Sequence, residues 1–138
     1  MYLATGTRHH DRRIPIPGFA EFGVYHLEAP STPKLVAALG LKAGVVTTGN
    51  SLGASEEDLA LFAESGAAVK DMEAASLAYV ASLFGTPLLA VKAVTDIVDG
   101  ERSTAEEFAE NLAAAAAALQ RALPRLIAFI AGKRLCDL

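Results

Sequence analysis

The strongest constraint on the fold is a nearly unbroken apolar run at residues 88–94, interrupted only by Lys92. A short run of this kind is typical of a strand that is covered on both faces, as in a parallel sheet. Lys92 is expected to lay its aliphatic stem along the strand and reach the sheet end or pair with an acid. The run therefore predicts a sheet with helices on both sides.

The rest of the chain alternates between strand and helix patterns. Short β-branched or apolar segments predict strands, and apolar residues at helical spacing between capping signals predict helices. This alternation indicates an α/β fold, a three-layer α/β/α sandwich around a mainly parallel or mixed central sheet. The predicted strands lie at residues 2–5, 44–48, 67–70 and 88–94, and the predicted helices at 33–39, 55–66, 73–84 and 103–132.

Several residues predict how the helices begin and end. Gly40 should stop the first helix, and Ser55 with Asp58 forms a capping box, as Ser103 with Glu106 would. Pro124 removes a backbone donor and is expected to kink or break the last helix. Apolar stripes are expected to face the sheet, and Asp137 and Leu138 are expected to fray. The stripes comprise Leu77, Val80, Ala81 and Phe84 in one helix and Phe108, Leu112, Ala115 and Leu119 in another.

Residues 14–33 are rich in proline and predict an ordered loop without a helix or strand. Phe19, Phe22 and Tyr25 lie on this loop and need cover. A partner subunit and the rest of the same domain are equally good sources of that cover.

Composition narrows the functional class. A length of 138 residues predicts one domain, and a formal net charge of −4 argues against a nucleic-acid-binding protein. A lone cysteine, Cys136, cannot form an intramolecular disulfide or a thiolate metal site, which favours a reducing, cytoplasmic location. No uninterrupted apolar run reaches the ~18–20 residues of a membrane span. Neither a membrane association nor a secretory signal is therefore expected.

Two carboxylates stand where an α/β sheet binds ligands, beyond the carboxyl ends of its strands. Glu73 lies in the first turn of a helix, where it could offset the helix dipole or accept hydrogen bonds from sugar hydroxyls. Asp96 follows the 88–94 strand, where it could be a turn residue or a proton donor to a heterocycle nitrogen. Asp99 is better explained as a turn residue before Gly100.

Other polar motifs carry weaker signals. Gly49 and Gly53 bracket a tight turn where the backbone could approach a flat ligand. His9, His10 and Asp11 invite a metal-binding interpretation, but no further ligand lies at a suitable spacing, so no metal and no cofactor are expected. His26 is expected to be structural. Nucleotide-binding glycine loops and hydrolase elbows are absent from the sequence.

The motifs DMEAA (residues 71–75) and VKAVTDIVDG (residues 91–100) resemble the 5′-methylthioadenosine/S-adenosylhomocysteine nucleosidase family, within the purine nucleoside phosphorylase superfamily. The motifs HDRRIP (residues 10–15) and TAEEFAENL (residues 104–112) are similar to its plant-type branch. The resemblance implies hydrolysis of 5′-methylthioadenosine, or of S-adenosylhomocysteine, in methionine salvage. A nucleoside phosphorylase and a noncatalytic nucleoside-binding or dimerisation module remain as alternatives.

The resemblance also implies roles for residues. Asp96 would protonate the purine at N7 and contact its amino group, and Glu73 would bind the ribose hydroxyls. Met72 would line the sugar site, while Leu52 and Gly53 would frame the base through backbone contacts. In a homodimer, the 14–25 loop would contribute to the alkylthio pocket of the other subunit.

Two departures from the family pattern bear on activity. Asn50 stands where the family usually has Asp, and it can replace that residue if the role is only to hold the turn. Residues 1–138 resemble only the C-terminal part of a single nucleosidase-like domain, without the half that carries the water-activating acid. An incomplete gene model is favoured over a fragment that needs its other half or a remnant that binds without catalysis.

Overall fold

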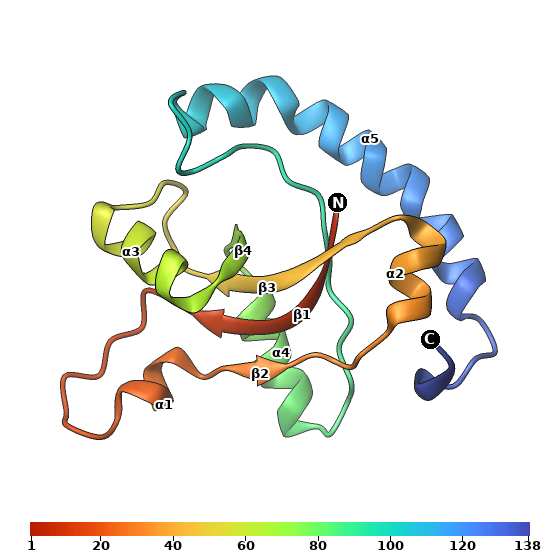
Figure 1. The fold of residues 1–138 in the computed structure, drawn as a ribbon, viewed down its shortest axis with the longest axis horizontal. Helices are drawn as coiled ribbons and strands as arrows, with labels where there is room; N and C mark the ends of the chain where they lie inside the picture. The colour runs from red at the N-terminus through yellow and green to blue at the C-terminus, as the bar shows by residue number, and fades with distance from the viewer.

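A computed structural model describes all 138 residues as a mixed α/β fold (Figure 1). A central sheet is covered by helices, and α5 arches across one side of it in Figure 1. The α/β class expected from the sequence is thus observed. The strands are β1 (Tyr2–His9), β2 (Leu27–Glu28), β3 (Lys42–Thr48), β4 (Ala67–Asp71) and β5 (Val91–Lys92). The helices are α1 (Ala20–Val24), α2 (Pro33–Leu39), α3 (Glu56–Ser65), α4 (Ala74–Leu83), α5 (Thr104–Ile130) and the 3₁₀ turn η1 (Leu135–Asp137).

The sheet combines parallel and antiparallel pairs. Strands β1, β3 and β4 are parallel neighbours, and β2 and β5 each pair antiparallel with β1. The last residues of the parallel strands are His9, Thr48 and Asp71, and the register aligns His9 with Thr48 and Thr48 with Asp71. The parallel register therefore brings the carboxyl ends of three strands to one edge of the sheet.

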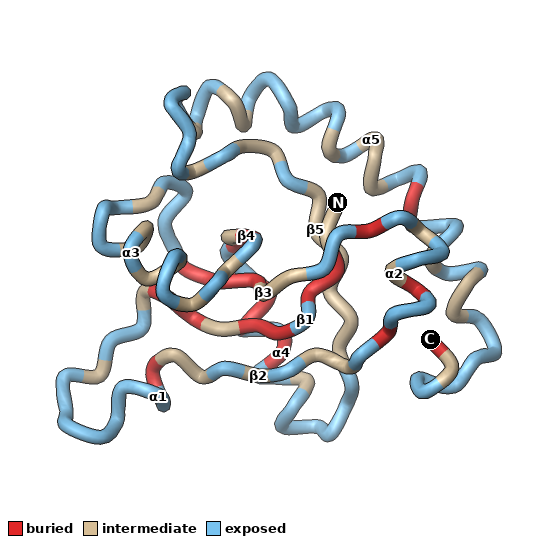
Figure 2. The backbone as a smooth tube through the Cα atoms, in the orientation of Figure 1, coloured by how far each residue is buried: buried red, intermediate tan, exposed pale blue.

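Two small apolar clusters form the core. Figure 2 shows buried residues along β1 and β3. One cluster packs Val46, Val69 and Ala74 between the sheet and α4. The other packs Leu3 and Leu35 against Leu126 and neighbouring side chains at the end of α5. The sheet is therefore covered by α4 on one face and by α2 with the C-terminal part of α5 on the other.

Most helix ends match the sequence prediction. Gly40 ends α2 with a left-handed conformation, and Ser55 caps α3 in a full capping box with Asp58. Ser103 starts α5 as predicted, but its side chain makes no capping hydrogen bond, so the second capping box is wrong. Pro124 lies inside an unbroken α5, so the predicted break is also wrong. The predicted fraying of the terminus is wrong as well, because Leu138 is buried and its carbonyl accepts from the Leu35 amide.

Two segments differ from their predicted structure. The 14–33 segment contains the short helix α1 and the strand β2, because Leu27 and Glu28 find an unpaired stretch of β1. The 88–94 run contributes only Val91 and Lys92 to the sheet, antiparallel to β1. The edge of β1 is shared between β2 and β5, so each pairs over only two residues. The prediction of a long buried parallel strand at 88–94 is therefore wrong.

The apolar stripe predicted for α4 does not face the sheet. Its buried residues are Ala74, Ala75 and Ala78, while Leu77 and Phe84 are 59% and 79% exposed. Small side chains let the helix backbone approach the strands closely, which leaves the larger apolar residues facing outward. The predicted inner stripe of α5 is only partly covered, since Leu112 is also exposed.

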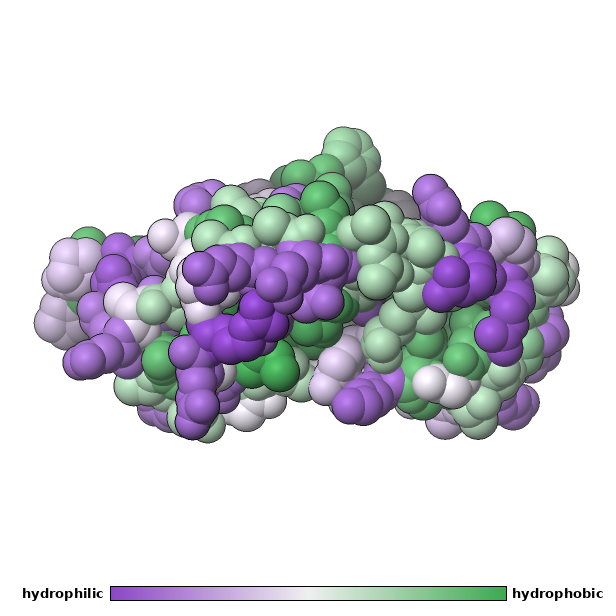
Figure 3. Space-filling model, turned by 90° about the horizontal axis from the view of Figure 1, so that it is seen from above, coloured by the Kyte–Doolittle hydropathy of each residue, from purple (hydrophilic) through white to green (hydrophobic).

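Helix α5 is long and apolar enough, by length and composition alone, to cross a membrane. The expectation from uninterrupted apolar runs missed this property, because charged residues are scattered along the helix. One helix of this kind is weak support for a membrane span. At the end of α5, Leu126, Phe129 and Ile130 pack against the core cluster that contains Leu3 and Leu35. The surface seen from above is a mixture of hydrophobic areas, in green, and hydrophilic areas, in purple (Figure 3).

Candidate functional site

The carboxylate of Asp71 ties the start of α4 to the ends of β3 and β4. Its Oδ2 accepts from the Ala74 amide at 2.9 Å, and its Oδ1 accepts from the Thr48 hydroxyl at 2.5 Å. The same hydroxyl oxygen accepts from the Ala75 amide at 2.9 Å. Two otherwise unpaired amides of the first helical turn are thus satisfied, as an N-terminal cap requires. This arrangement fixes the direction in which α4 leaves the sheet.

Glu73 occupies the N-cap position of α4, one residue before the predicted helical turn. Its side chain makes no capping hydrogen bond and is 65% exposed, so the carboxylate remains free to accept hydrogen bonds from a ligand. Met72 precedes it and is 41% exposed. The helix start therefore presents these two predicted site residues to solvent on a fixed backbone.

Lys92 links these carboxylates from β5. Its ammonium lies 2.8 Å from Asp71 Oδ2 and 3.7 Å from Glu73 Oε2. The expectation that Lys92 pairs with an acid is thus confirmed. Because the Asp71 side chain is almost fully buried, the ion pair compensates the cost of placing its charge inside the protein.

Asp96 lies in the segment between β5 and α5, where the first turns of α5 hold the backbone. Asn111 Nδ2 donates to the Thr95 carbonyl, and the Ile97 amide donates to Glu107 Oε2, both at 2.9 Å. The Thr95 hydroxyl donates to Asp96 Oδ1 at 2.5 Å, which leaves the other carboxylate oxygen free. The Asp96 side chain is therefore presented on a segment that is tied down on both sides.

Lys70 binds the loop that follows β3. Its ammonium donates to the carbonyl oxygens of Ser51, in a short contact, and Leu52, at 3.0 Å. Burial lowers the pKa of Lys70, and the carboxylate that opposes this most strongly is Asp96, followed by Asp58 and Asp71. Asp96 and the loop carrying Leu52 consequently share the electrostatic environment of one lysine.

The two glycines of the turn after β3 have different surroundings. A Cβ on Gly49 would lie 2.2 Å from His10 Nε2, so glycine is required here by the imidazole and not by a ligand. Gly53 has no atom within 4 Å of the position of a Cβ. Leu52 is 48% exposed beside it. Only the Gly53 side of the turn is therefore open to a ligand.

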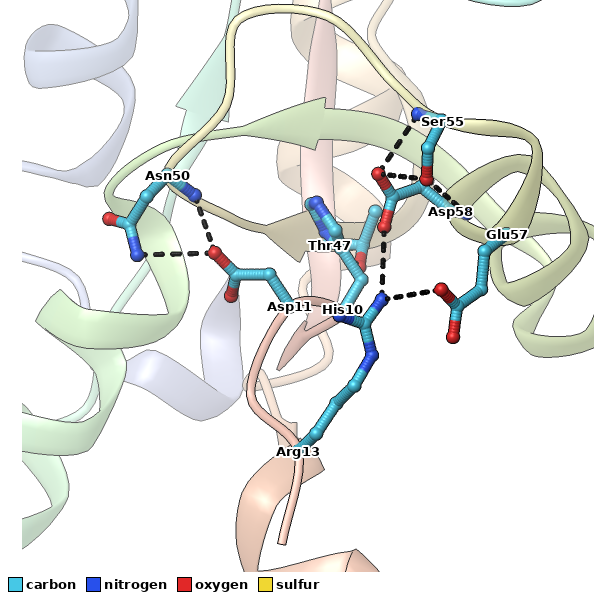
Figure 4. Close-up of polar contacts among 8 residues, drawn as sticks. All are labelled: His10, Asp11, Arg13, Thr47, Asn50, Ser55, Glu57 and Asp58. Carbon is cyan, nitrogen blue, oxygen red and sulfur yellow. Dashed lines mark hydrogen bonds and ion pairs between the residues drawn. The ribbon is translucent and has the colours of Figure 1, made fainter. Parts of the chain in front are cut away.

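His9 and His10 are both buried at this edge, and Figure 4 shows His10 beside Thr47. The His10 ring shares a 3.1 Å hydrogen bond with the Thr47 hydroxyl and packs edge-on against Phe62, with 4.8 Å between ring centroids. Burial lowers the pKa of both histidines, which favours their neutral forms. No group of three His, Cys, Asp or Glu side chains is placed to hold a metal ion. His26, in turn, contacts Glu28 at 2.9 Å.

The sequence and the fold of this chain are similar to those of known proteins. The family model for the phosphorylase superfamily matches residues 1–128. The chain belongs to the phosphorylase superfamily. It is 47% identical to a 5′-methylthioadenosine nucleosidase of Arabidopsis thaliana over all 138 residues, and 46% identical to a 5′-methylthioadenosine/S-adenosylhomocysteine nucleosidase of the same plant. The crystal structure of an A. thaliana 5′-methylthioadenosine nucleosidase in its apo form superposes with a TM-score of 0.94 at 47% identity, over 99% of this chain.

The matches to these nucleosidases cover almost all of this chain but only about half of each relative. The chain spans 52% and 54% of the two nucleosidases and 56% of the solved structure, about half their length. The described residues supply the region around Glu73 and Asp96 of a superfamily domain.

The presence of Asn at position 50 is explained by its contacts with Asp11. Its backbone amide and its side-chain Nδ2 both donate to Asp11 Oδ2, at 2.7 and 3.1 Å (Figure 4). The two contacts join the turn after β3 to the residues that follow β1. An aspartate at position 50 would place a second carboxylate beside Asp11, so the amide suits this superfamily member better.

Sequence reasoning did not predict the contacts that Asp71, Thr48, Asp11 and Lys70 make at this edge. Asp71 carried a usable signal, because an Asp three residues before a helical amide is a common capping arrangement. Thr48 and Lys70 carried none, since their roles depend on which strands become neighbours. Arg13, which lies 3.2 Å from Glu57 and 3.8 Å from Asp58, ties the same edge to the start of α3 (Figure 4). The Ser55 amide lowers the pKa of the Asp58 carboxylate to which it donates.

Proposed function

We propose that these residues form the C-terminal part of a single nucleosidase domain that hydrolyses the N-glycosidic bond of 5′-methylthioadenosine to adenine and 5-methylthioribose. The observation that carries the proposal is the presentation of Glu73 at the docked start of α4, in a chain 46–47% identical along its whole length to two nucleosidases. S-adenosylhomocysteine is a second candidate substrate, since one of those relatives is named for it. The reaction belongs to methionine salvage.

In the proposed mechanism Asp96 gives a proton to N7 of the purine while the bond from C1′ to N9 breaks. Adenine then leaves as a neutral base, and the sugar passes through an oxocarbenium-like state. Glu73 accepts hydrogen bonds from the ribose hydroxyls, and its exposed carboxylate has one oxygen, Oε1, with no ion-pair partner, while Oε2 lies 3.7 Å from the Lys92 ammonium. Met72 lines the sugar, and Leu52 and Gly53 frame the base. Water then adds to C1′ and gives a proton to a carboxylate, which we place in the part of the relatives that this chain does not match.

Adenine release from 5′-methylthioadenosine by the full-length protein tests the proposal. We expect release in phosphate-free buffer at a rate that added phosphate does not raise, because the attacking group is water. A rate that depends on phosphate would identify a phosphorylase. Binding of 5′-methylthioadenosine without release would identify a noncatalytic module, and either result would contradict the proposal. The same assay with S-adenosylhomocysteine settles the second substrate.

We further propose that the full-length protein is a homodimer in the cytoplasm. Phe19 and Phe22 are 49% and 62% exposed and stack on each other at 5.5 Å, on the 14–25 segment that projects from the sheet in Figure 1. Exposed paired aromatics on a projecting segment need cover, which a neighbouring subunit would give. We expect the mass of a dimer in light scattering, and Phe22→Ser should shift it toward the monomer. A monomeric wild-type protein would contradict the dimer.

A further inference from the structure

Lys70 makes the only hydrogen bonds that fix the loop between Asn50 and Ser55. Its ammonium donates to the carbonyl oxygens of Ser51 and Leu52, and no other hydrogen bond involves residues 51–54. The flanks of this loop are held independently, by the contacts from Asn50 to Asp11 and from Ser55 to Asp58. The conformation of the intervening residues therefore depends on one lysine.

Two backbone amides are oriented by this contact. The carbonyl of one residue and the amide of the next lie in one plane and point in opposite directions across a trans peptide. No cis peptide bond occurs in the chain. By holding the carbonyls of Ser51 and Leu52, Lys70 fixes the direction of the Leu52 and Gly53 amides, which point away from the lysine in the same peptide planes.

Neither of these amides donates to another group of the chain. The side of the loop at Gly53 is open, and the Leu52 side chain is 48% exposed. Pre-oriented, unpaired amides in an open position are donors for a ligand that offers a hydrogen-bond acceptor. The ring nitrogens of a purine are acceptors of this kind.

We infer that Lys70 is a positioning residue that holds the amides of Leu52 and Gly53 ready to donate to ring nitrogens of the adenine base. The inference rests on the proposed function for the identity of the ligand. Lys70 itself does not touch the substrate, and it acts through the loop. The partial burial that lowers the pKa of Lys70 is consistent with this role, because a desolvated ammonium gains more from carbonyl partners than one in water.

Replacing Lys70 with Met in the full-length protein tests the inference. We expect KM for 5′-methylthioadenosine to rise on the order of tenfold while kcat changes little, because disordered amides weaken binding of the base. Backbone order parameters from ¹⁵N relaxation should fall for residues 51–54 and stay unchanged in β3. Lys70→Arg should restore most of the affinity, because a guanidinium can also donate to two carbonyls.

Lys34→Met is the matched control, because it removes the same charge from the exposed face of α2 and should leave KM unchanged. If Lys70→Met does not fold, Lys70→Val removes the same charge and the same donors with a β-branched side chain that suits a strand, and it carries the same expectations. Unchanged KM and unchanged order parameters in a folded variant would overturn the inference. The order parameters are measured without substrate, so a wild-type protein that releases no adenine would refute the proposed function and leave the loop-ordering role of Lys70 separately testable.

Discussion

Asp96→Asn in the full-length protein is expected to slow adenine release from 5′-methylthioadenosine by about a hundredfold or more, the scale of losing a general acid. Asparagine keeps the size of the side chain and can still accept from the Thr95 hydroxyl, so the loop should hold its shape. What disappears is the proton that makes adenine a neutral leaving group. Initial rates and KM, measured by adenine absorbance or by coupled oxidation, check the prediction.

Asp99→Asn is the matched control for this prediction. It makes the same change of charge three residues away, at an exposed position that the sequence assigns to a turn. We expect it to retain near-normal turnover. If Asp96→Asn turns over as fast as the wild type, Asp96 is not the proton donor. If both variants lose activity equally, the effect belongs to the general charge of the segment.

The sequence predicted the class of fold because its local signals are strong. The helix ends at Gly40, Ser55 and Gly66 all depend on residues next to them in the chain, and the structure has each helix end where predicted. The errors arise where the structure of a segment depends on a strand that is distant in the sequence. Val91 and Lys92 look like part of a long central strand, yet the edge of β1 is already shared with β2, so only two residues pair.

The candidate site shows the same division. Glu73 and Asp96 were identified from short motifs, and their roles are predictions. The supporting residues Thr48 and Lys70 come from β3 and β4, and they meet the motif residues only through the parallel register of those strands. A single sequence contains no signal for that register beyond the apolar pattern. The reacting groups are therefore easier to predict from sequence than the groups that hold them.

Asp71→Asn should destabilise the full-length protein by about 3 kcal/mol, the lower end of the cost of breaking a buried ion pair, because Lys92 is still partly exposed. The variant leaves the Lys92 ammonium without its nearest anion. Asparagine also cannot accept from Ala74, Thr48 and Lys92 together, since one of its two terminal atoms is a donor. Urea unfolding midpoints, compared at an unchanged m-value, measure the loss.

The double variant Asp71→Asn with Lys92→Met separates the ion pair from the capping role of Asp71. Removing the unpaired charge should recover part of the stability, with a coupling energy of about 1–3 kcal/mol between the two positions. The unrecovered remainder measures the capping of α4. Glu73→Gln is the control, since that side chain is 65% exposed and the change should alter stability by less than about 0.5 kcal/mol. Fully additive losses at Asp71 and Lys92 would mean that their 2.8 Å contact does not stabilise the fold, and that α4 is held by its backbone contacts alone.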